Sequence, residues 1–407
     1  MTRFVLLVVV TILSPLSGCL GAEESTVISG QSLVENKDVI HQAGQLVIEA
    51  GALYEVVGGT LRLAPQPDII INGLIEVRGR LVLRDTILAN VLRVNVYPGA
   101  SIYFDNVSVE AGAAAPKFVM GGDAAFLRSR LHVHQMIFGG TATLEGNTIT
   151  SDTLLPALHW KAGSGRLLDN VITATGHAVV VEDAELEARG NTIVAGSQDT
   201  TTGIAAVRSL ALLVDNDITA AVAIAYEQSQ GEATGNRLHD TPQAGMSIRQ
   251  PRGAITLAEN SIERVGRAGI YVQGGTPSTR LEGNRITEVG REARATDLAN
   301  ASAGIALDGG APQVRGNTIT RAYIGVAILA GSPAITANDV VESSYFAMLR
   351  ATEAATLPID VSDNYWGGPT GPTPATPDAS LPAAPTGTAR VGPGLRYMPW
   401  ATASMAP

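Results

Sequence analysis

Cysteine and lysine are almost absent from this chain of 407 residues, and acidic residues outnumber basic ones. Cys19 is the only cysteine, which excludes an intramolecular disulfide framework. Lysine occurs only at positions 37, 117 and 161, so the cationic side chains are mainly arginines. The formal net charge of −10 disfavours binding to nucleic acid and electrostatic attachment to anionic lipid. We therefore expect no nucleic acid partner.

The first residues contain an apolar run that is too short to span a bilayer comfortably. Residues Phe4–Leu13 follow Arg3 and precede the segment Leu16–Cys19, which reads LSGC. This order is typical of a secretory signal that ends in a lipobox. We predict cleavage after residue 18, lipid modification of Cys19, and an extracytoplasmic, membrane-anchored protein at the cell surface or in the periplasm. The alternative is an ordinary cleaved signal with an incidental cysteine.

An asparagine recurs at intervals of 20 to 33 residues, usually after Gly or Asp and two positions before an apolar residue. A period in the low twenties indicates a solenoid. The side-chain amides of stacked asparagines can satisfy backbone groups at a bend, so a structural role is favoured over a catalytic one. The ten positions are Asn147, Asn170, Asn191, Asn216, Asn236, Asn260, Asn284, Asn317, Asn338 and Asn364.

The repeat between Asn260 and Asn284 predicts three short strands, at residues 261–263, 269–272 and 279–281. Apolar residues alternate with polar or small ones in each, which is the pattern of a strand with one buried face. Leucine-rich repeats share this period, but their longer helical side is missing. We predict an all-β fold, a single-stranded parallel β-helix of about 13 to 14 turns at the usual strand spacing.

The domain boundaries follow from this repeat. Residues 1–18 are expected to form the signal peptide, and 19–44 an anchor leash and N-terminal cap. Residues 45–366 are expected to form one β-helix domain, and 367–407 a proline-rich loop and closing cap. An open solenoid end exposes strand edges, and bulky Trp366 and Trp400 are suited to covering it.

The last segments carry a resemblance to a known family. Residues 364–372 read NYWGGPTGP and residues 397–400 read YMPW, similar to the closing segment of many β-helix surface proteins. Together with the repeat, they resemble the right-handed parallel β-helix family of the pectate-lyase-like superfamily. The resemblance implies a right-handed helix, secretion, a rigid scaffold and frequent contact with polysaccharide.

Lyases of this superfamily carry clustered carboxylates for calcium and a basic residue on an outward strand face. Here the corresponding outward positions are small or neutral, which favours a non-catalytic protein, and we assign no catalytic residue. If the chain is an enzyme, a carbohydrate-active lyase, hydrolase or epimerase is expected. We predict no cofactor, with calcium left open. The outward positions are Val180, Ala205, Ala225, Ser247, Tyr271, Ala306 and Ala327.

The residues four positions after successive asparagines form a second column, in which acidic and basic residues alternate. Its regular alternation predicts a ladder of opposite charges, each pair contributing about 0.2–1 kcal/mol. Asp217 and Arg237 form a similar pair one column away. An acid/base site is the alternative interpretation. The column contains Asp240, Arg264, Glu288, Arg321 and Glu342.

The histidines offer only a weak metal candidate. His132 and His134 share the outward face of one strand, but two ligands do not make a metal site, and Thr150 is the expected neighbour. His177 follows a glycine as in polygalacturonase-type β-helix hydrolases. The aspartates that those enzymes need do not occur at matching positions.

One interval, from Asn284 to Asn317, is 33 residues long, and the surplus at 291–302 favours a short helix. Loops on a rigid scaffold are where function concentrates. The favoured function is non-catalytic binding or adhesion toward glycans or surface proteins. A lyase or epimerase, and a periplasmic metal-handling or enzyme-maturation factor, are the alternatives. The predicted ligand-binding residues are Arg267, Arg291, Arg294, Asp297, Tyr323 and Tyr345, although the two tyrosines equally suit an aromatic ladder.

Overall fold

The computed structural model describes residues 25–41, 44–63, 73–110, 114–198, 200–290, 302–350, 358–368, 370–374 and 389–405. All regular secondary structure in these ranges is β-strand. Within the same ranges, no helix long and apolar enough to cross a membrane was found. The chain divides into two compact units, unit 1 (Met1–Asp152) and unit 2 (Thr153–Pro407).

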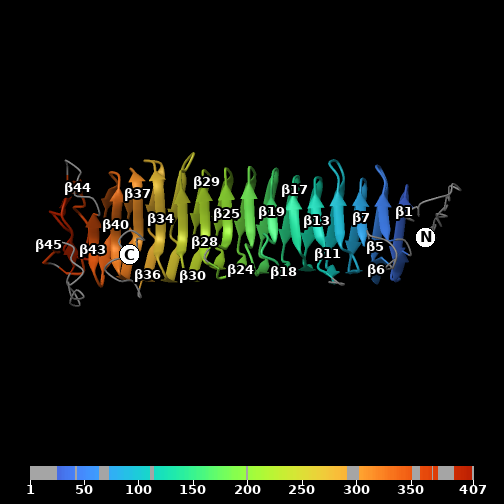
Figure 1. Ribbon diagram of the computed structural model, residues 1–407, viewed down its shortest axis with the longest axis horizontal. Coiled ribbons are helices and arrows are strands. Elements are labelled where there is room, and N and C mark those ends of the chain that lie inside the picture. The colour runs from blue at the N-terminus through green and yellow to red at the C-terminus, as the bar shows by residue number, and fades with distance from the viewer. Residues whose placement is uncertain are drawn as a thin grey trace, which may run out of the picture. The chain divides into compact units, whose positions relative to one another are not determined.

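Both units are built from rungs, each of three strands that join three parallel sheets (Figure 1). In unit 1, sheet A contains β1 (Ser25–Ile28), β4 (Gln45–Ile48), β7 (Leu74–Val77), β10 (Arg93–Val96), β13 (Lys117–Met120) and β16 (Gln135–Phe138). Sheet B contains β2 (Gln31–Glu35), β5 (Leu53–Val57), β8 (Arg80–Arg84), β11 (Ser101–Asp105), β14 (Asp123–Leu127) and β17 (Thr141–Glu145). Sheet C contains β3 (Val39–His41), β6 (Thr60–Leu63), β9 (Ile87–Ala89), β12 (Ser108–Val109), β15 (Arg130–His132) and β18 (Thr148–Ser151).

Unit 2 repeats this arrangement. Its sheet A contains β19 (Leu158–Trp160), β22 (Val179–Glu182), β25 (Thr202–Val207), β28 (Val222–Glu227), β31 (Ala244–Arg249), β34 (Ala268–Gly275), β37 (Ala303–Gly310), β40 (Ile324–Ala330), β43 (Phe346–Arg350), β45 (Thr373–Pro374) and β46 (Arg390–Val391). Sheet B contains β20 (Ser164–Leu168), β23 (Glu185–Arg189), β26 (Leu210–Val214), β29 (Gln230–Thr234), β32 (Ile255–Ala258), β35 (Thr279–Glu282), β38 (Gln313–Arg315) and β41 (Ala334–Thr336).

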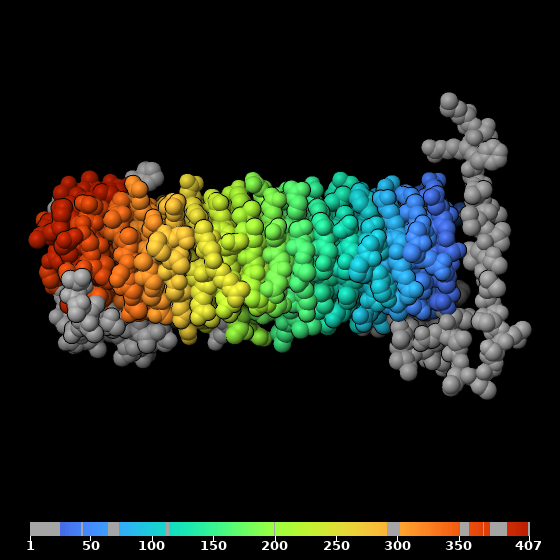
Figure 2. Space-filling model, turned by 90° about the horizontal axis from the view of Figure 1, so that it is seen from above, coloured from blue at the N-terminus to red at the C-terminus, as the bar shows by residue number. Residues whose placement is uncertain are grey.

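Sheet C of unit 2 contains β21 (Val171–Ala174), β24 (Thr192–Val194), β27 (Asp217–Thr219), β30 (Arg237–Thr241), β33 (Ser261–Val265), β36 (Arg285–Val289), β39 (Thr318–Ala322) and β42 (Asp339–Val341). A separate pair, β44 (Ile359–Asp360) and β47 (Leu395–Arg396), closes the unit. In each unit successive rungs stack in chain order, as the colour bands of Figure 2 show. The prediction of an all-β parallel β-helix of about 13 to 14 turns is confirmed.

The core consists of aliphatic side chains stacked in register. In sheet C of unit 2, Ile218 pairs with Leu238, Leu238 with Ile262, and Ile262 with Ile286, and all four are fully buried. Parallel pairing places the same rung position directly above itself, so the alternating pattern of one rung is repeated in the next. The buried face is therefore continuous within the unit.

The first rung begins earlier than the predicted start near residue 45. β1 pairs in parallel with β4, and β2 and β3 pair with β5 and β6. Residues 25–29, assigned to the anchor leash, therefore include the strand β1. The sequence alternation is weak here because the inward positions of this rung are partly polar.

The 33-residue interval between Asn284 and Asn317 does not interrupt the stacking of rungs. Asn284 donates its backbone N–H and side-chain amide to the side-chain oxygen of Asn317, so these residues remain on neighbouring rungs. Residues 302–310 rejoin the stack directly, since Ala303 donates its backbone N–H to the carbonyl of Arg267. The predicted helix, with Arg291, Arg294 and Asp297, lies outside the described residues.

Tryptophans lie in the closing segments of unit 2. Trp366 is 1% exposed, directly after Tyr365, which bridges Asp339 and Ala401. A Cβ placed on Gly371 would lie within 2.4 Å of the Trp400 ring, so only glycine allows this approach. The segments predicted to cap the helix thus pack against its last rungs.

Candidate functional site

The bend between sheets B and C, the BC bend, is closed by asparagines. The side-chain oxygen of Asn236 accepts hydrogen bonds from the backbone N–H and the amide of Asn216, at 3.0 and 2.9 Å. Its own amide donates to the carbonyl of Leu213 and to the side chain of Asn260. All donors and acceptors of this buried amide are used, which gives the column a structural role and leaves nothing for a ligand.

The bend between sheets A and B, the AB bend, uses the same device with a shorter side chain. The hydroxyl of Ser229 accepts from the backbone N–H of Ser209, and the hydroxyl of Ser209 accepts from that of Ala184. Each hydroxyl also donates to the carbonyl two residues before it, which belongs to Val207 or Glu227. A hydroxymethyl group fills less space than an amide, so the AB bend is less completely filled than the BC bend.

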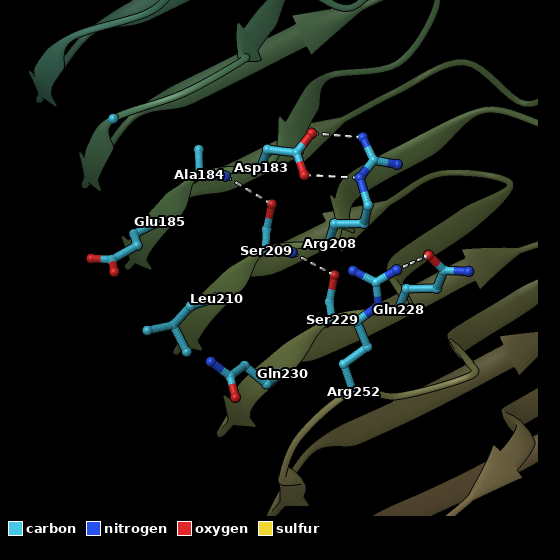
Figure 3. A pocket seen from close by; sticks show the side chains of 11 residues that line it. Asp183, Ala184, Glu185, Arg208, Ser209, Leu210, Gln228, Ser229, Gln230 and Arg252 are labelled. Atoms are coloured by element: carbon cyan, nitrogen blue, oxygen red, sulfur yellow. Dashed lines mark hydrogen bonds and ion pairs between the residues drawn. The ribbon is translucent and has the colours of Figure 1, made fainter.

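A groove of about 520 Å³ runs along the AB bend across consecutive rungs (Figure 3). Its floor is formed by the small, buried residues Ala184, Ser209 and Ser229. The longer side chains on its two sides come from the residues that flank this floor. They are Asp183, Glu185, Arg208, Leu210, Gln228, Gln230 and Arg252.

The backbone directs one set of these side chains outward. Asp183, Arg208 and Gln228 each adopt a left-handed conformation, with φ of 51°, 50° and 49°. Each stands one position before the small floor residue, so the chain turns sharply at that point. The triplets at 183–185, 208–210 and 228–230, each with a small central residue, recur in the sequence and could have predicted this groove.

Ion pairs hold the groove side chains in place. The Arg208 guanidinium donates to both carboxylate oxygens of Asp183, at 2.8 and 2.7 Å, and to Glu182 at 3.1 Å. Arg252 donates to the side-chain oxygen of Gln228 at 2.8 Å. Hydrogen bonding from Arg208 lowers the pKa of Asp183, so this carboxylate stays ionised and is unsuited to act as a general acid near neutral pH.

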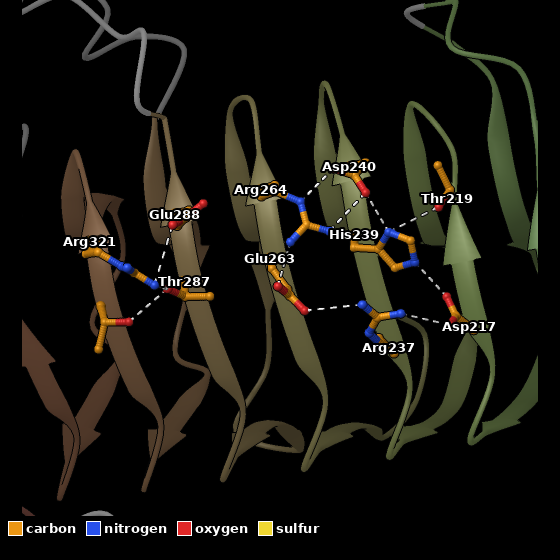
Figure 4. A network of polar contacts seen from close by, with 11 residues as sticks. Asp217, Thr219, Arg237, His239, Asp240, Glu263, Arg264, Thr287, Glu288 and Arg321 are labelled. Atoms are coloured by element: carbon orange, nitrogen blue, oxygen red, sulfur yellow. Dashed lines mark hydrogen bonds and ion pairs between the residues drawn. The ribbon is translucent and has the colours of Figure 1, made fainter.

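A second polar cluster lies on sheet C (Figure 4). Arg237 pairs with Asp217 at 3.1 Å, as predicted, and with Glu263 at 3.6 Å. His239 lies between two carboxylates, 2.7 Å from Asp217 and 2.7 Å from Asp240. These side chains neutralise one another across neighbouring rungs, which is typical of a structural network.

The predicted charge column forms part of this network. Arg264 pairs with Asp240 at 2.7 Å, and Arg321 with Glu288 at 3.5 Å. Arg264 also reaches sideways to Glu263 at 2.7 Å, so the pairing spreads over two columns and differs from a strict ladder. Hydrogen bonds from Arg264 and then His239 lower the pKa of Asp240. The fifth column residue, Glu342, shares the left-handed conformation of the others.

Two of the histidine candidates have an acidic or a hydroxyl partner, whereas His134 lies beyond the end of β15 and does not share a strand with His132 as expected. The side chain of His132 lies 3.0 Å from Asp152, so the expectation that only Thr150 would lie nearby was wrong. Among the described residues, no group of three or more potential ligands is placed to hold a metal. His177 accepts from the backbone N–H of Thr202 at 3.2 Å, and burial lowers its pKa.

Part of the predicted ligand-binding set meets at the bend between sheets C and A, the CA bend. Arg267 is exposed there, and Gly290 and Ser302, which flank the surplus in sequence, lie at the same bend. The Tyr323 and Tyr345 rings stack at 5.2 Å with an interplanar angle of 6°. Tyr345 is only 4% exposed, so it is a packing residue and cannot offer its face to a sugar. The aromatic ladder is the interpretation that the geometry favours.

The outward positions of sheet A lie in register, as expected. Val180 pairs with Ala205, Ala205 with Ala225, and Ala225 with Ser247, followed by Tyr271. Tyr271 donates to Asp308 at 2.9 Å. The neighbouring Ala306 and Ala327 are buried. The described residues of this column carry no clustered carboxylates.

Comparison with known proteins supports the handedness of the fold. Residues 208–364 match the family model described as a right handed beta helix region, and the predicted right-handed β-helix is confirmed. No curated protein matches the sequence. The chain is similar to the crystal structure of Dettilon tailspike protein, with 12% identity, a TM-score of 0.38, and coverage of 80% of this chain and 62% of that one. It spans less than two thirds of that protein's length, and no functional conclusion follows from a similarity this distant.

Proposed function

We propose that this chain is a lipid-anchored, extracytoplasmic β-helix protein that binds a glycan in the AB groove without chemical change. The observation that carries the proposal is the groove itself. It combines a floor of small residues with planar amide, guanidinium and carboxylate groups repeated from rung to rung. Hydroxyl-rich ligands are recognised by such groups when hydrogen bonding and ion pairing have already oriented them.

The charge of the groove favours a neutral glycan. Two acids, Asp183 and Glu185, are balanced by two bases, Arg208 and Arg252, among its lining side chains. Neighbouring strands lie about 4.8 Å apart, so recognition groups recur at a spacing comparable to one sugar unit of an extended polymer. The ion pair between Arg208 and Asp183 and the hydrogen bond from Arg252 to Gln228 reduce the side-chain freedom that binding must remove.

A glycan array probed with the purified protein, with and without calcium, tests the binding activity. On the glycan identified, Arg252→Ala and Gln230→Ala are expected to weaken affinity, each by about 1–3 kcal/mol, the range for losing a polar contact at a binding site. Arg280→Ala, an exposed arginine on sheet B outside the groove, is the matched control. An affinity equal to that of the wild type in all three variants would refute the groove as the binding site.

The same assay separates the groove from the insertion at the CA bend. Deletion of 291–301, joining Gly290 to Ser302, removes the predicted residues Arg291, Arg294 and Asp297. We expect the groove-bound glycan to be retained. If instead the deletion or Tyr323→Ala abolishes binding while Arg252→Ala does not, the insertion is the site. If mass spectrometry shows that the bound glycan becomes shorter with time, the protein is an enzyme instead.

The anchor is tested at Cys19. We expect Cys19→Ser to release the protein from membranes or to leave its precursor unprocessed, because the sulfur is where the lipid would be attached. Membrane fractionation and the intact mass provide the measurement. The same partition and the same mass in wild type and variant would exclude lipidation.

A further inference from the structure

The first rung of unit 1 exposes one large apolar side chain on each of its three faces. Val27 on sheet A is 42% exposed, Leu33 on sheet B 58%, and Ile40 on sheet C 54%. We call these three side chains the collar. Single exposed apolar residues are common on protein surfaces. Among the described residues of unit 1, however, no other rung exposes an apolar side chain on all three sheets.

The outward positions change character in the next rung. Leu33 pairs with Glu55, Ile40 with Arg62, and Val27 with the less exposed Val47. Two of the three apolar positions are therefore replaced by charges one strand spacing away. The collar is confined to the rung that lies nearest to the N-terminus in sequence.

Three of the inward positions change in the opposite sense. Thr26 pairs with Leu46, Ser32 with Tyr54, and His41 with Leu63. Three other inward positions of the first rung are apolar, since Ile28 pairs with Ile48, Val34 with Val56, and Val39 with Leu61. The first rung therefore mixes polar and apolar residues on its inward face, while its most exposed apolar side chains are those of the collar.

We propose that the collar contacts the interfacial region of the membrane that holds the lipid anchor. Ser25, the first residue of β1, follows Cys19 by six positions. Six extended residues span at most about 20 Å, so a lipid at Cys19 keeps the first rung close to the headgroups. This inference rests on the proposed lipid anchor.

The contact is apolar in nature. The charged side chains of the first rung include Glu35, Lys37 and Asp38, with an excess of acid. Such a rung gains nothing electrostatically from anionic lipid. Binding through the collar therefore depends on burial of Val27, Leu33 and Ile40 and is insensitive to salt.

Cysteine scanning tests the proposal on the full chain. The lipidated wild type has no free thiol, because Cys19 is the only cysteine and its sulfur carries the lipid. Val27→Cys, Leu33→Cys and Ile40→Cys are labelled with a nitroxide in phosphatidylcholine vesicles. Leu212→Cys is the control, since Leu212 is 41% exposed on sheet B of unit 2. We expect oxygen to relax the collar labels severalfold more, relative to a water-soluble nickel chelate, than the control label.

The outcomes distinguish the collar from the anchor. If the collar labels relax like the control label, and the wild type takes up no label, the collar contact is overturned and the lipid anchor is retained. Labelling of wild-type Cys19 overturns both. A second copy of the chain could instead cover the collar. In that case the collar labels would show dipolar broadening that disappears on dilution with unlabelled protein, and oxygen would not relax them. This result would also overturn membrane contact.

Discussion

The BC and AB bends of unit 2 solve one problem with side chains of different size. At each bend, a residue with a left-handed backbone is followed by a polar residue whose side chain points inward. The side-chain oxygen of that polar residue accepts a hydrogen bond from a backbone N–H of the preceding rung. Asparagine at the BC bend fills the corner and also bonds to its neighbours in the column. Serine at the AB bend satisfies the backbone but leaves space above it. Satisfied hydrogen bonding and filled volume are therefore separate requirements of a bend.

The largest effect is expected from breaking the filled bend. Asn236→Ala removes the acceptor used by Asn216 and the donor used by Leu213 and Asn260. Each buried group left unpaired costs about 1–3 kcal/mol, so we expect a loss of about 3 kcal/mol or more. Equilibrium urea unfolding measures this loss. A loss below that of Ser229→Ala would contradict the ranking of the two bends.

Ser229→Ala should have a smaller effect at the open bend. It leaves the backbone N–H of Ser209 without its acceptor, for a loss of about 1–2 kcal/mol. Ser229→Asn gives the AB bend the side chain that fills the BC bend, and its amide would extend into the groove. We expect this variant to weaken glycan binding more than it changes stability. Unchanged affinity in a folded Ser229→Asn protein would argue against the groove.

The charge column lies on sheet C, near the ends of its strands, and its contribution should be smaller again. Arg264→Glu places an acid beside Asp240 and Glu263, where Arg264 now pairs with both. We expect a loss of about 1 kcal/mol at low salt, reduced at high salt. Exchanging Arg264 and Glu288 should cost more than exchanging charges outside the column. Identical melting of both variants and wild type in low salt would show that the network contributes nothing.

The smallest expected difference concerns acid. Arg208 lowers the pKa of Asp183 in the folded protein below its ordinary value of 3.8. A lowered carboxyl pKa contributes stability that is present above the unfolded value and is lost as pH falls through the folded one. Urea unfolding between pH 5 and pH 3 should therefore show less loss of stability in Arg208→Gln than in wild type. Asn236→Ala, which changes no titratable group, should retain the wild-type slope.

The repeat could be read from the sequence because its signals are local and periodic. An asparagine, a left-handed residue before it and an apolar residue after it recur on each rung, and parallel stacking turns this period into a column. The first rung was missed because three of its inward positions, Thr26, Ser32 and His41, are polar, which weakens the alternation. The contact between His132 and Asp152 was missed because the two residues belong to neighbouring rungs.

Sequence alone was enough to predict the solenoid, its three strands per rung, the inward face of the strands in the regular repeats, and the asparagine column. These follow from alternation and period, which depend on short stretches of chain. Only the tertiary structure decided that the AB bend forms a groove, that Arg264 divides its pairing between Asp240 and Glu263, and that Tyr345 is buried against Tyr323 and Phe346. Side-chain volume and partner choice depend on neighbours more than twenty residues away, and those neighbours come together only when the rungs stack.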